Sequence, residues 1–452
     1  MLRSNPATIS RSHKLRLHKA VISTIALTFS LSGQAATSTE LTLANALQKT
    51  LSNSPTLQRF TFQEREAEAL RLQSSITPTP TLKLSVENAF GSDQLSGLDS
   101  AEITLGLSQV IELGDKRAAR IGLSDARWQT QLANYELTRL DVLAETSRRY
   151  YFLLEQQALT ANLVERKKLE RAALKVIKQR QQAGAIGSAD AAKMKLRLAQ
   201  TEMQQLKSAA ETQRRKARLA MMWLGRADFD SVQGSLIQLP PPTDTQQFLN
   251  LIEASPAFQQ KLMLNRLALA DIKKQQSLNR SDVTVGVGVR QFEARNDQAL
   301  VFDISMPLTF SNPNRGNLAA AYSRQQWADT EQQLTQRLLS LEIQSLGQGL
   351  NAYRQRAQQL ADQQLPRAEQ LLREVKRGYR QGLYGVLQLV DAQTELFNVK
   401  KQQIQLHRQL LLQRLAIEQI SGQALPTTSA QLTLPTNTDA SQTAIESVMG
   451  AK

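Results

Sequence analysis

The most constraining feature of the sequence is a long stretch with the character of one unbroken helix. Between Lys116 and Ala183 the chain has a single glycine and no proline. The stretch is rich in Ala, Leu, Gln, Arg, Lys and Glu, all of which favour helix formation. A continuous helix over this range would be about 100 Å long, at 1.5 Å per residue. No compact globular domain needs such a helix, so the sequence predicts a long helical architecture.

The sequence is also duplicated. Asn53–Gln58 resembles Ala254–Gln259, and Gly184–Gly187 resembles Gly382–Gly385 at nearly the same separation. The order of predicted elements repeats as well: a helix, two strand-like segments, a very long helix, a glycine-containing turn and a returning helix. Such self-similarity indicates two copies of one structural unit. The opening helices of the two copies are predicted over Leu41–Ser74 and Phe248–Gln276.

The strand-like segments alternate apolar and polar residues, which gives each strand one apolar and one mainly polar face. They are centred on residues 82–86, 103–107, 283–289 and 300–306. Gly106, Gly286 and Gly288 lie on the polar faces, where they would leave room or permit curvature. Four strands are too few for a transmembrane barrel, which has at least about eight, but three copies of the chain would supply twelve. The alternative is that the strands pack on the core of a soluble domain.

The second copy differs from the first in its helices. Pro366 interrupts the long helix and predicts a kink or a restart, because proline lacks the N–H donor and clashes with the preceding turn. The returning helix carries a heptad register that favours side-by-side helix packing, as in a coiled coil or a buried stripe of a bundle. Its members are Leu389, Ala392, Leu396, Val399, Gln403, Leu406 and Leu410.

The N-terminus has the features of a secretory signal. A basic segment without acids precedes the mostly apolar run 20–31, and small residues follow up to Ala35, where we expect cleavage. Beyond the signal no apolar run is long enough for a transmembrane helix, so the long helices are expected in water. The predicted organisation is a signal peptide (1–35), a first repeat (36–225), a linker (226–247), a second repeat (248–422) and a disordered C-terminal tail (423–452).

Composition argues against several chemistries. The chain has no cysteine, and only His407 of its three histidines lies outside the signal. Catalysis by Ser/His or Cys/His pairs and zinc binding are therefore nearly excluded, and we expect no catalytic residue, no metal site and no cofactor. His407 is expected to be structural. The net charge is +15, but the cations are interleaved with Glu and Gln along helices, which favours solvated faces over nucleic-acid binding.

The chain resembles the TolC-like outer-membrane efflux proteins, in particular the CzcC-like heavy-metal-exporter branch. The resemblance extends from Leu41 to Gly422 and rests on the order and spacing of five motifs. They are Leu41–Leu47, Asn53–Pro55, the strand-to-helix junction Glu112–Arg117, the junction Asn314–Gly316, and Leu365–Pro366 through Tyr379–Gly382 to Leu389–Gln393.

The resemblance implies an all-α coiled-coil tunnel joined to a membrane β-barrel. Each chain would give four strands, and a homotrimer would form a twelve-stranded barrel above an α-helical barrel. The strands would lie in outer-membrane lipid and the tunnel in the periplasm. The implied partners are a periplasmic adaptor (membrane fusion) protein and an inner-membrane pump of the resistance-nodulation-division type.

The resemblance also implies a gate at the helical turns. Two aspartates follow the second turn in the family pattern, and here those positions are Gln388 and Asp391, so only the second acid is present. Tyr379 matches a gate tyrosine, and Tyr384 replaces the arginine that shares the gate. In the first repeat, Asp190 would face the lumen or serve as a helix-N-terminal acid, and the same two alternatives apply to Asp391. Tight turns that contact the adaptor or pump are expected at Gly184, Gly187, Gly382 and Gly385.

The predicted function is a passive exit duct of a tripartite efflux system for metal cations or small toxic compounds, with the gate chiefly in the second repeat. The chain is not expected to be an enzyme. Two alternatives remain from the sequence: an exit duct for type I protein secretion, and a periplasmic coiled-coil scaffold without a pore.

Overall fold

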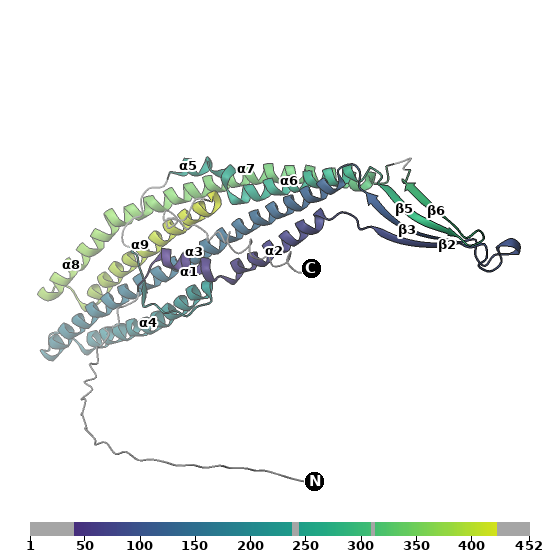
Figure 1. Cartoon of the computed structure of the whole chain (residues 1–452). Helices are drawn as coiled ribbons and strands as arrows, with labels where there is room; N and C mark the ends of the chain where they lie inside the picture. The colour runs from purple at the N-terminus through teal and green to yellow at the C-terminus, as the bar shows by residue number, and fades with distance from the viewer. Residues whose placement is uncertain (1–39, 237–243, 309–311, 423–452) are drawn as a thin grey trace, which may run out of the picture. The chain divides into compact units, whose positions relative to one another are not determined.

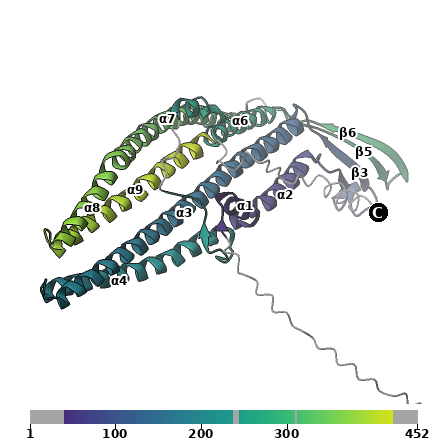
Figure 2. The same cartoon turned by 90° about the vertical axis from the view of Figure 1, so that its left-hand side faces the viewer.

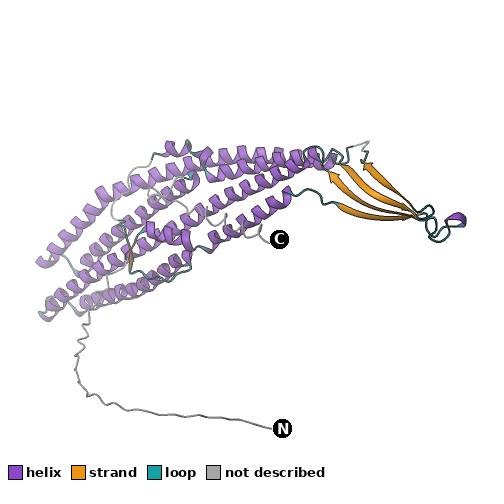
Figure 3. Ribbon diagram, viewed as in Figure 1, coloured by secondary structure: helices purple, strands orange, loops and turns teal. Residues whose placement is uncertain are grey.

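The structure is a computed structural model that describes residues 40–236, 244–308 and 312–422. The predicted signal peptide and C-terminal tail lie outside these residues, as does part of the predicted linker. All the described residues belong to one compact unit. Figure 3 shows a four-stranded sheet at one end of the long helices.

The first repeat begins with two helices, α1 (Leu43–Asn53) and α2 (Pro55–Ser75). The single helix predicted over this range is therefore wrong. Ser54 has an extended backbone (φ −68°, ψ 121°), because the ring of a following proline disfavours the helical region. The second repeat shows the same break: α5 (Thr245–Leu249) and a short turn precede α6 (Pro256–Ser277), and Ser255 before Pro256 is extended.

The long helices largely follow the prediction. Helix α3 is continuous from Lys116 to Gln182, and α4 (Ser188–Ala220) returns beside it. In the second repeat α7 (Arg315–Gln359) passes through one π-helical turn, Leu360–Gln364, into α8 (Leu365–Gln381), and α9 (Val386–Ser421) returns. Pro366 therefore marks a restart, as predicted. The carbonyl with which its ring would clash lies in the wider π turn.

The heptad positions of α9 pack as predicted, since all seven are buried or half-buried. Helix α9 lies against α3, α7 and α8 (Figure 1).

His407 is structural, as expected. It is 2% exposed, and its Nδ1 lies 2.7 Å from the carbonyl oxygen of Leu236 in the predicted linker. The same linker contains β4 (Ser231–Val232), which pairs in parallel with β1 (Glu40–Leu41) beside an apolar cluster around Tyr150 and Trp223.

The two predicted hairpins join into one antiparallel sheet in the order β2–β3–β5–β6. The strands are β2 (Thr81–Glu87), β3 (Glu102–Ile111), β5 (Val283–Phe292) and β6 (Asp297–Ser305). The central pair, β3 and β5, comes from different repeats.

The prediction that glycine leaves room within the sheet is confirmed at Gly288 of β5. A Cβ on Gly288 would lie 2.8 Å from the Leu105 carbonyl oxygen of β3, so only glycine permits this close approach. A Cβ on Gly286 would overlap the carboxylate of Asp303 on β6. The flexible end of the Asp303 side chain fills the space beside Gly286.

Candidate functional site

The sheet has one apolar and one polar face, as the alternation predicted. The apolar side chains are exposed along all four strands: Phe302 is 75% and Ile304 78% exposed. On the opposite face the guanidinium of Arg290 binds Glu102 (2.9 Å) and Thr104 (3.0 Å), and it lies 3.3 Å from Glu87. These contacts connect β2, β3 and β5. Burying these charged groups on an apolar surface would cost free energy.

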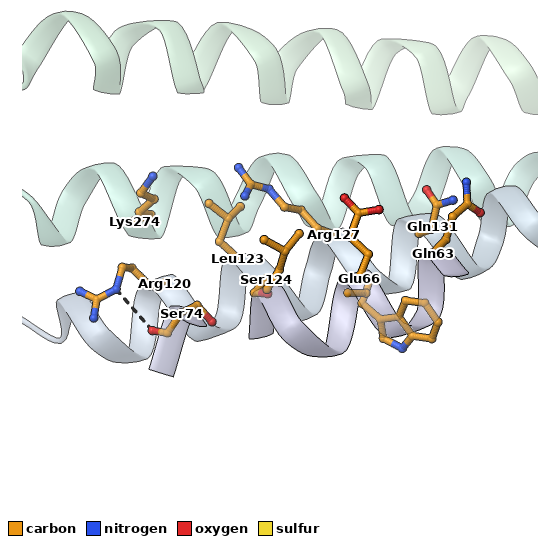
Figure 4. A pocket seen from close by; sticks show the side chains of 12 residues that line it. Gln63, Glu66, Ser74, Arg120, Leu123, Ser124, Arg127, Gln131 and Lys274 are labelled. Atoms are coloured by element: carbon orange, nitrogen blue, oxygen red, sulfur yellow. Dashed lines mark hydrogen bonds between the residues drawn. The ribbon is translucent and has the colours of Figure 1, made fainter. Parts of the chain in front are cut away.

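The polar side continues from the sheet onto the helices. Glu112 directly follows β3, an even number of residues after Thr104, so the alternation of the strand places both on the same face. Glu112 pairs with Arg120 of α3. The Arg120 guanidinium also donates from Nε to the Ser74 carbonyl oxygen at the end of α2 (3.4 Å). Figure 4 shows that Arg120 lines a pocket between α2 and α3 together with Glu66, Arg127 and Lys274 of α6. Glu112 and Arg120 thus lead from the polar side of the sheet to this pocket.

At the other end of the helices the two hairpin turns lie at the same end of the molecule (Figure 2), and they share one apolar cluster. The first repeat contributes Ile177 and Met194, and the second contributes Val375, Tyr379 and Leu389, among other residues. Gly184 (φ +73°) ends the α3 side and Gly382 (φ +81°) ends α8 in the left-handed conformation, which glycine adopts without strain. Gly187 and Gly385 are the extended N-caps of α4 and α9. The four glycines therefore form the tight turns that the sequence predicted.

Tyr379 is 3% exposed in an apolar cluster to which both repeats contribute. The guanidinium of Arg180, in the last turn of α3, lies 4.8 Å from the Tyr379 ring centroid. Arg180 also donates to the carbonyl oxygens of Tyr379 (2.7 Å) and Arg380 (2.9 Å) at the end of α8. Burial is the main cause that raises the pKa of Tyr379; the Arg180 cation opposes this shift, and the Asp190 carboxylate adds to it.

The sequence does not predict a role for Arg180, because the family resemblance places Tyr384 at the position of the gate arginine. The available signal was a cation four positions before the first turn glycine. Tyr384 is half-exposed in the second turn, and its ring covers Gly378, where a Cβ would lie 2.3 Å from it. Tyr384 therefore packs on its own hairpin.

The remaining predicted residues differ in their surroundings. Gln388 caps α9, because its Oε1 accepts the N–H of Gly385 (3.1 Å). Asp391 is exposed on α9, one turn further along. Burial is the main cause that lowers the pKa of Arg197 on α4, and the carboxylates of Glu170 and Asp391 act against that shift. Asp190 is half-buried in the first turn of α4. The helix dipole favours an acid at this position.

Comparison with known proteins identifies the chain. The model of the "Outer membrane efflux protein" family matches residues 46–224 and 252–423. The chain belongs to this family. It is 26% identical over 333 residues to the cobalt-zinc-cadmium resistance protein CzcC of Cupriavidus metallidurans, which covers 73% of this chain and 77% of CzcC.

Solved structures of the same fold support the family assignment. The outer-membrane channel OprN aligns with a TM-score of 0.69 at 19% identity, over 84% of this chain and 90% of that one. The outer membrane protein VceC of Vibrio cholerae aligns with a TM-score of 0.67 at 18% identity, over 84% and 96%. The chain is thus an outer membrane efflux protein with a TolC-like fold, and the predicted combination of helical hairpins with four strands is confirmed. None of the helices in the described parts of the chain is apolar and long enough to cross a membrane.

Proposed function

We propose that three copies of the chain close their sheets into a twelve-stranded barrel in the outer membrane. The carrying observation is the four-stranded sheet itself, with an exposed apolar face and no neighbour at β2 or β6 within the described residues. In hydrocarbon each unpaired backbone group costs several kcal/mol, so an open sheet needs closure. Copies joined edge to edge would place the apolar faces toward lipid and the polar Arg290 faces around an aqueous pore.

The trimer would act as the exit duct of a tripartite efflux system. The helical hairpins would extend into the periplasm, where the turns at Gly184–Gly187 and Gly382–Gly385 meet a periplasmic adaptor and an inner-membrane pump of the resistance-nodulation-division type. The similarity to a cobalt-zinc-cadmium resistance protein supports divalent metal cations as the cargo. The pump would select the cargo, and the duct would let it pass.

The hairpin turns are the proposed gate. Three copies of Asp391 around the trimer axis would form a ring of like charge, which favours cations. The Arg180–Tyr379 contact would hold the two hairpins of each copy together, and Gln388 would fix the start of the helix that carries Asp391. In this arrangement both repeats contribute to the gate.

The test of insertion is an arginine placed on either face of β6. Phe302→Arg puts a charge on the apolar face at a cost of about 2–4 kcal/mol per chain near the bilayer midplane. Val301→Arg, the neighbouring position, puts the same charge on the polar face. We expect Phe302→Arg to abolish the heat-modifiable form in outer-membrane fractions and Val301→Arg to retain it. Normal insertion of Phe302→Arg would refute the assigned face.

The test of the cargo is a deletion strain challenged with cobalt, zinc and cadmium salts, and with dyes and detergents. We expect metal tolerance to fall and to be restored by the wild-type gene, but not by Phe302→Arg. Unchanged metal tolerance with increased dye sensitivity would refute metal cations as cargo and leave the duct intact.

A further inference from the structure

A groove of about 820 Å³ lies between the beginning of α3 and the C-terminal half of α6, next to the strand–helix junction. We call it the α3–α6 groove. One wall is made of small residues, Gly114 just before α3 and Ala118 and Gly122 within it. The opposite wall contains Arg266 and Lys273 of α6 and Arg280 just after that helix. No residue discussed so far for the gate or the pore lines it.

The groove opens on the apolar side of the sheet. Arg120 belongs to the polar side, where it pairs with Glu112 and lines the pocket of Figure 4. Ala118 and Gly122 lie two positions before and after Arg120, which turns them about 200° away on a helix with 3.6 residues per turn. The α3–α6 groove therefore continues the face that carries Leu107 and Ile111, both of which are exposed.

Arg266 and Lys273 lie seven residues apart on one face of α6, and Arg280 follows at the same interval, three residues beyond the end of the helix. All three are exposed, and none forms an ion pair within residues 40–236, 244–308 and 312–422. The groove lining contains one acid, Asp115. Three cations against one carboxylate give the groove a positive charge and leave it open to an anion.

Arg280 is held at the sheet end of the groove. Its side-chain methylenes lie directly over Gly114, where a Cβ would come within 2.4 Å of the Arg280 Cγ. Gly114 also has a left-handed backbone (φ +70°), so the position favours glycine twice over. Arg280 is therefore fixed close to the sheet, three residues before Val283, the first residue of β5.

We propose that the α3–α6 groove binds the phosphate headgroup of an anionic phospholipid in the membrane leaflet that faces the periplasm, with Arg280 and Lys273 as the binding residues. The inference rests on the proposed insertion of the sheet into the membrane. The acyl chains would cover the apolar sheet face, and the headgroup would enter the groove beside it.

The dimensions favour two of the three cations. The polar interface of a bilayer extends about 5–8 Å beyond the hydrocarbon on each side. Arg280 adjoins the sheet, and Lys273 lies about 10 Å further along the helix axis, within reach of its flexible side chain. Arg266 lies about 20 Å from Arg280, beyond the headgroups. Arg266 therefore provides a matched control on the same helix face.

The test is native mass spectrometry of the full-length protein in detergent with equal amounts of phosphatidylglycerol and phosphatidylcholine. We expect the wild type to retain phosphatidylglycerol preferentially. Each removed cation should lower this preference about fivefold, and Arg280→Gln with Lys273→Gln about 25-fold. Arg266→Gln should stay within about twofold of the wild type, and Arg280→Lys should keep most of the preference.

Three results would overturn the lipid site: no preference in the wild type, an unchanged preference in the double variant, or an equal loss in Arg266→Gln. Displacement of the lipid by millimolar inorganic phosphate would assign the groove to free phosphate and also overturn it. Reconstitution into pure phosphatidylcholine vesicles separates this inference from the proposed function. Failure of the wild type to insert there would refute the function, whereas normal insertion without lipid preference would refute the site alone.

Discussion

Replacing Arg180 by methionine tests whether the two hairpins of one chain are held together at their tips. Methionine keeps the apolar stem of the side chain but removes the guanidinium. The variant loses the hydrogen bonds to the carbonyl oxygens of Tyr379 and Arg380 and the stacking on the Tyr379 ring. All three contacts join the end of α3 to the end of α8. The α3–α4 contacts and the shared apolar cluster remain.

The size of the effect follows from these contacts. A hydrogen bond from a charged donor contributes about 1.5–3 kcal/mol when shielded from water, and stacking on an aromatic ring about 0.5–1 kcal/mol at an exposed site. The bond to Arg380 is exposed, so we count it as negligible. The remaining contributions sum to about 2–4 kcal/mol, and we take about 2 kcal/mol because the bond to Tyr379 is only partly buried. If these contacts form only in the closed state, their loss shifts the open-to-closed ratio about 30-fold toward open, since 1.4 kcal/mol corresponds to a factor of ten.

The assay is single-channel recording of the purified protein in planar bilayers. We expect Arg180→Met to raise the ratio of open to closed time about 30-fold. The conductance of the open barrel should stay unchanged. Lys178→Met is the control, because Lys178 is an exposed cation two positions away. An open fraction equal to that of the wild type, or an equal increase in Lys178→Met, would refute the role of the Arg180 contacts.

Two further predictions concern titratable side chains. Asp391→Asn should lower the preference for cations, measured as a smaller reversal potential in a salt gradient. Glu395→Gln, one turn further along α9, should not; equal effects of the two variants would show that Asp391 has no special place at the constriction. Burial lowers the pKa of His407 below 6.5, so its contribution to stability is complete above pH 6.5 and is lost as the pH falls through the lowered folded-state pKa. The melting temperature should therefore drop between pH 7 and pH 5, and by less in His407→Gln; identical pH profiles for both proteins would contradict this.

The fold was predicted where the signal is local. The apolar–polar alternation located all four strands, and the absence of glycine and proline located α3 within one residue of its C-terminal end. Pro366 marked the restart at α8 because a proline changes the backbone of its own turn. Prolines also interrupt the opening helices of both repeats, at Ser54–Pro55 and at Ser255–Pro256, where the sequence predicted uninterrupted helices.

The candidate site was harder to predict because its contacts cross between the repeats. Arg180 and Tyr379 are far apart in the sequence, and nothing in the residues around either one indicates the other. Gln388 shows a second difficulty. The family comparison directed attention to the missing acid, but the structure gives this side chain a capping role that requires only an acceptor oxygen. A position can therefore lose a charge and still stabilise the helix start.

The asymmetry between the repeats has a consequence for how a gate can be built. Helix α3 is regular over its whole length, whereas the corresponding chain of the second repeat contains the π turn Leu360–Gln364 followed by Pro366. A π turn at a proline disrupts the regular hydrogen-bond ladder and marks where a helix bends. The residue that reaches across to hold the end of α8 is Arg180, on the regular helix. The first repeat thus supplies the anchor and the second the interrupted element, so neither half alone contains the complete tip.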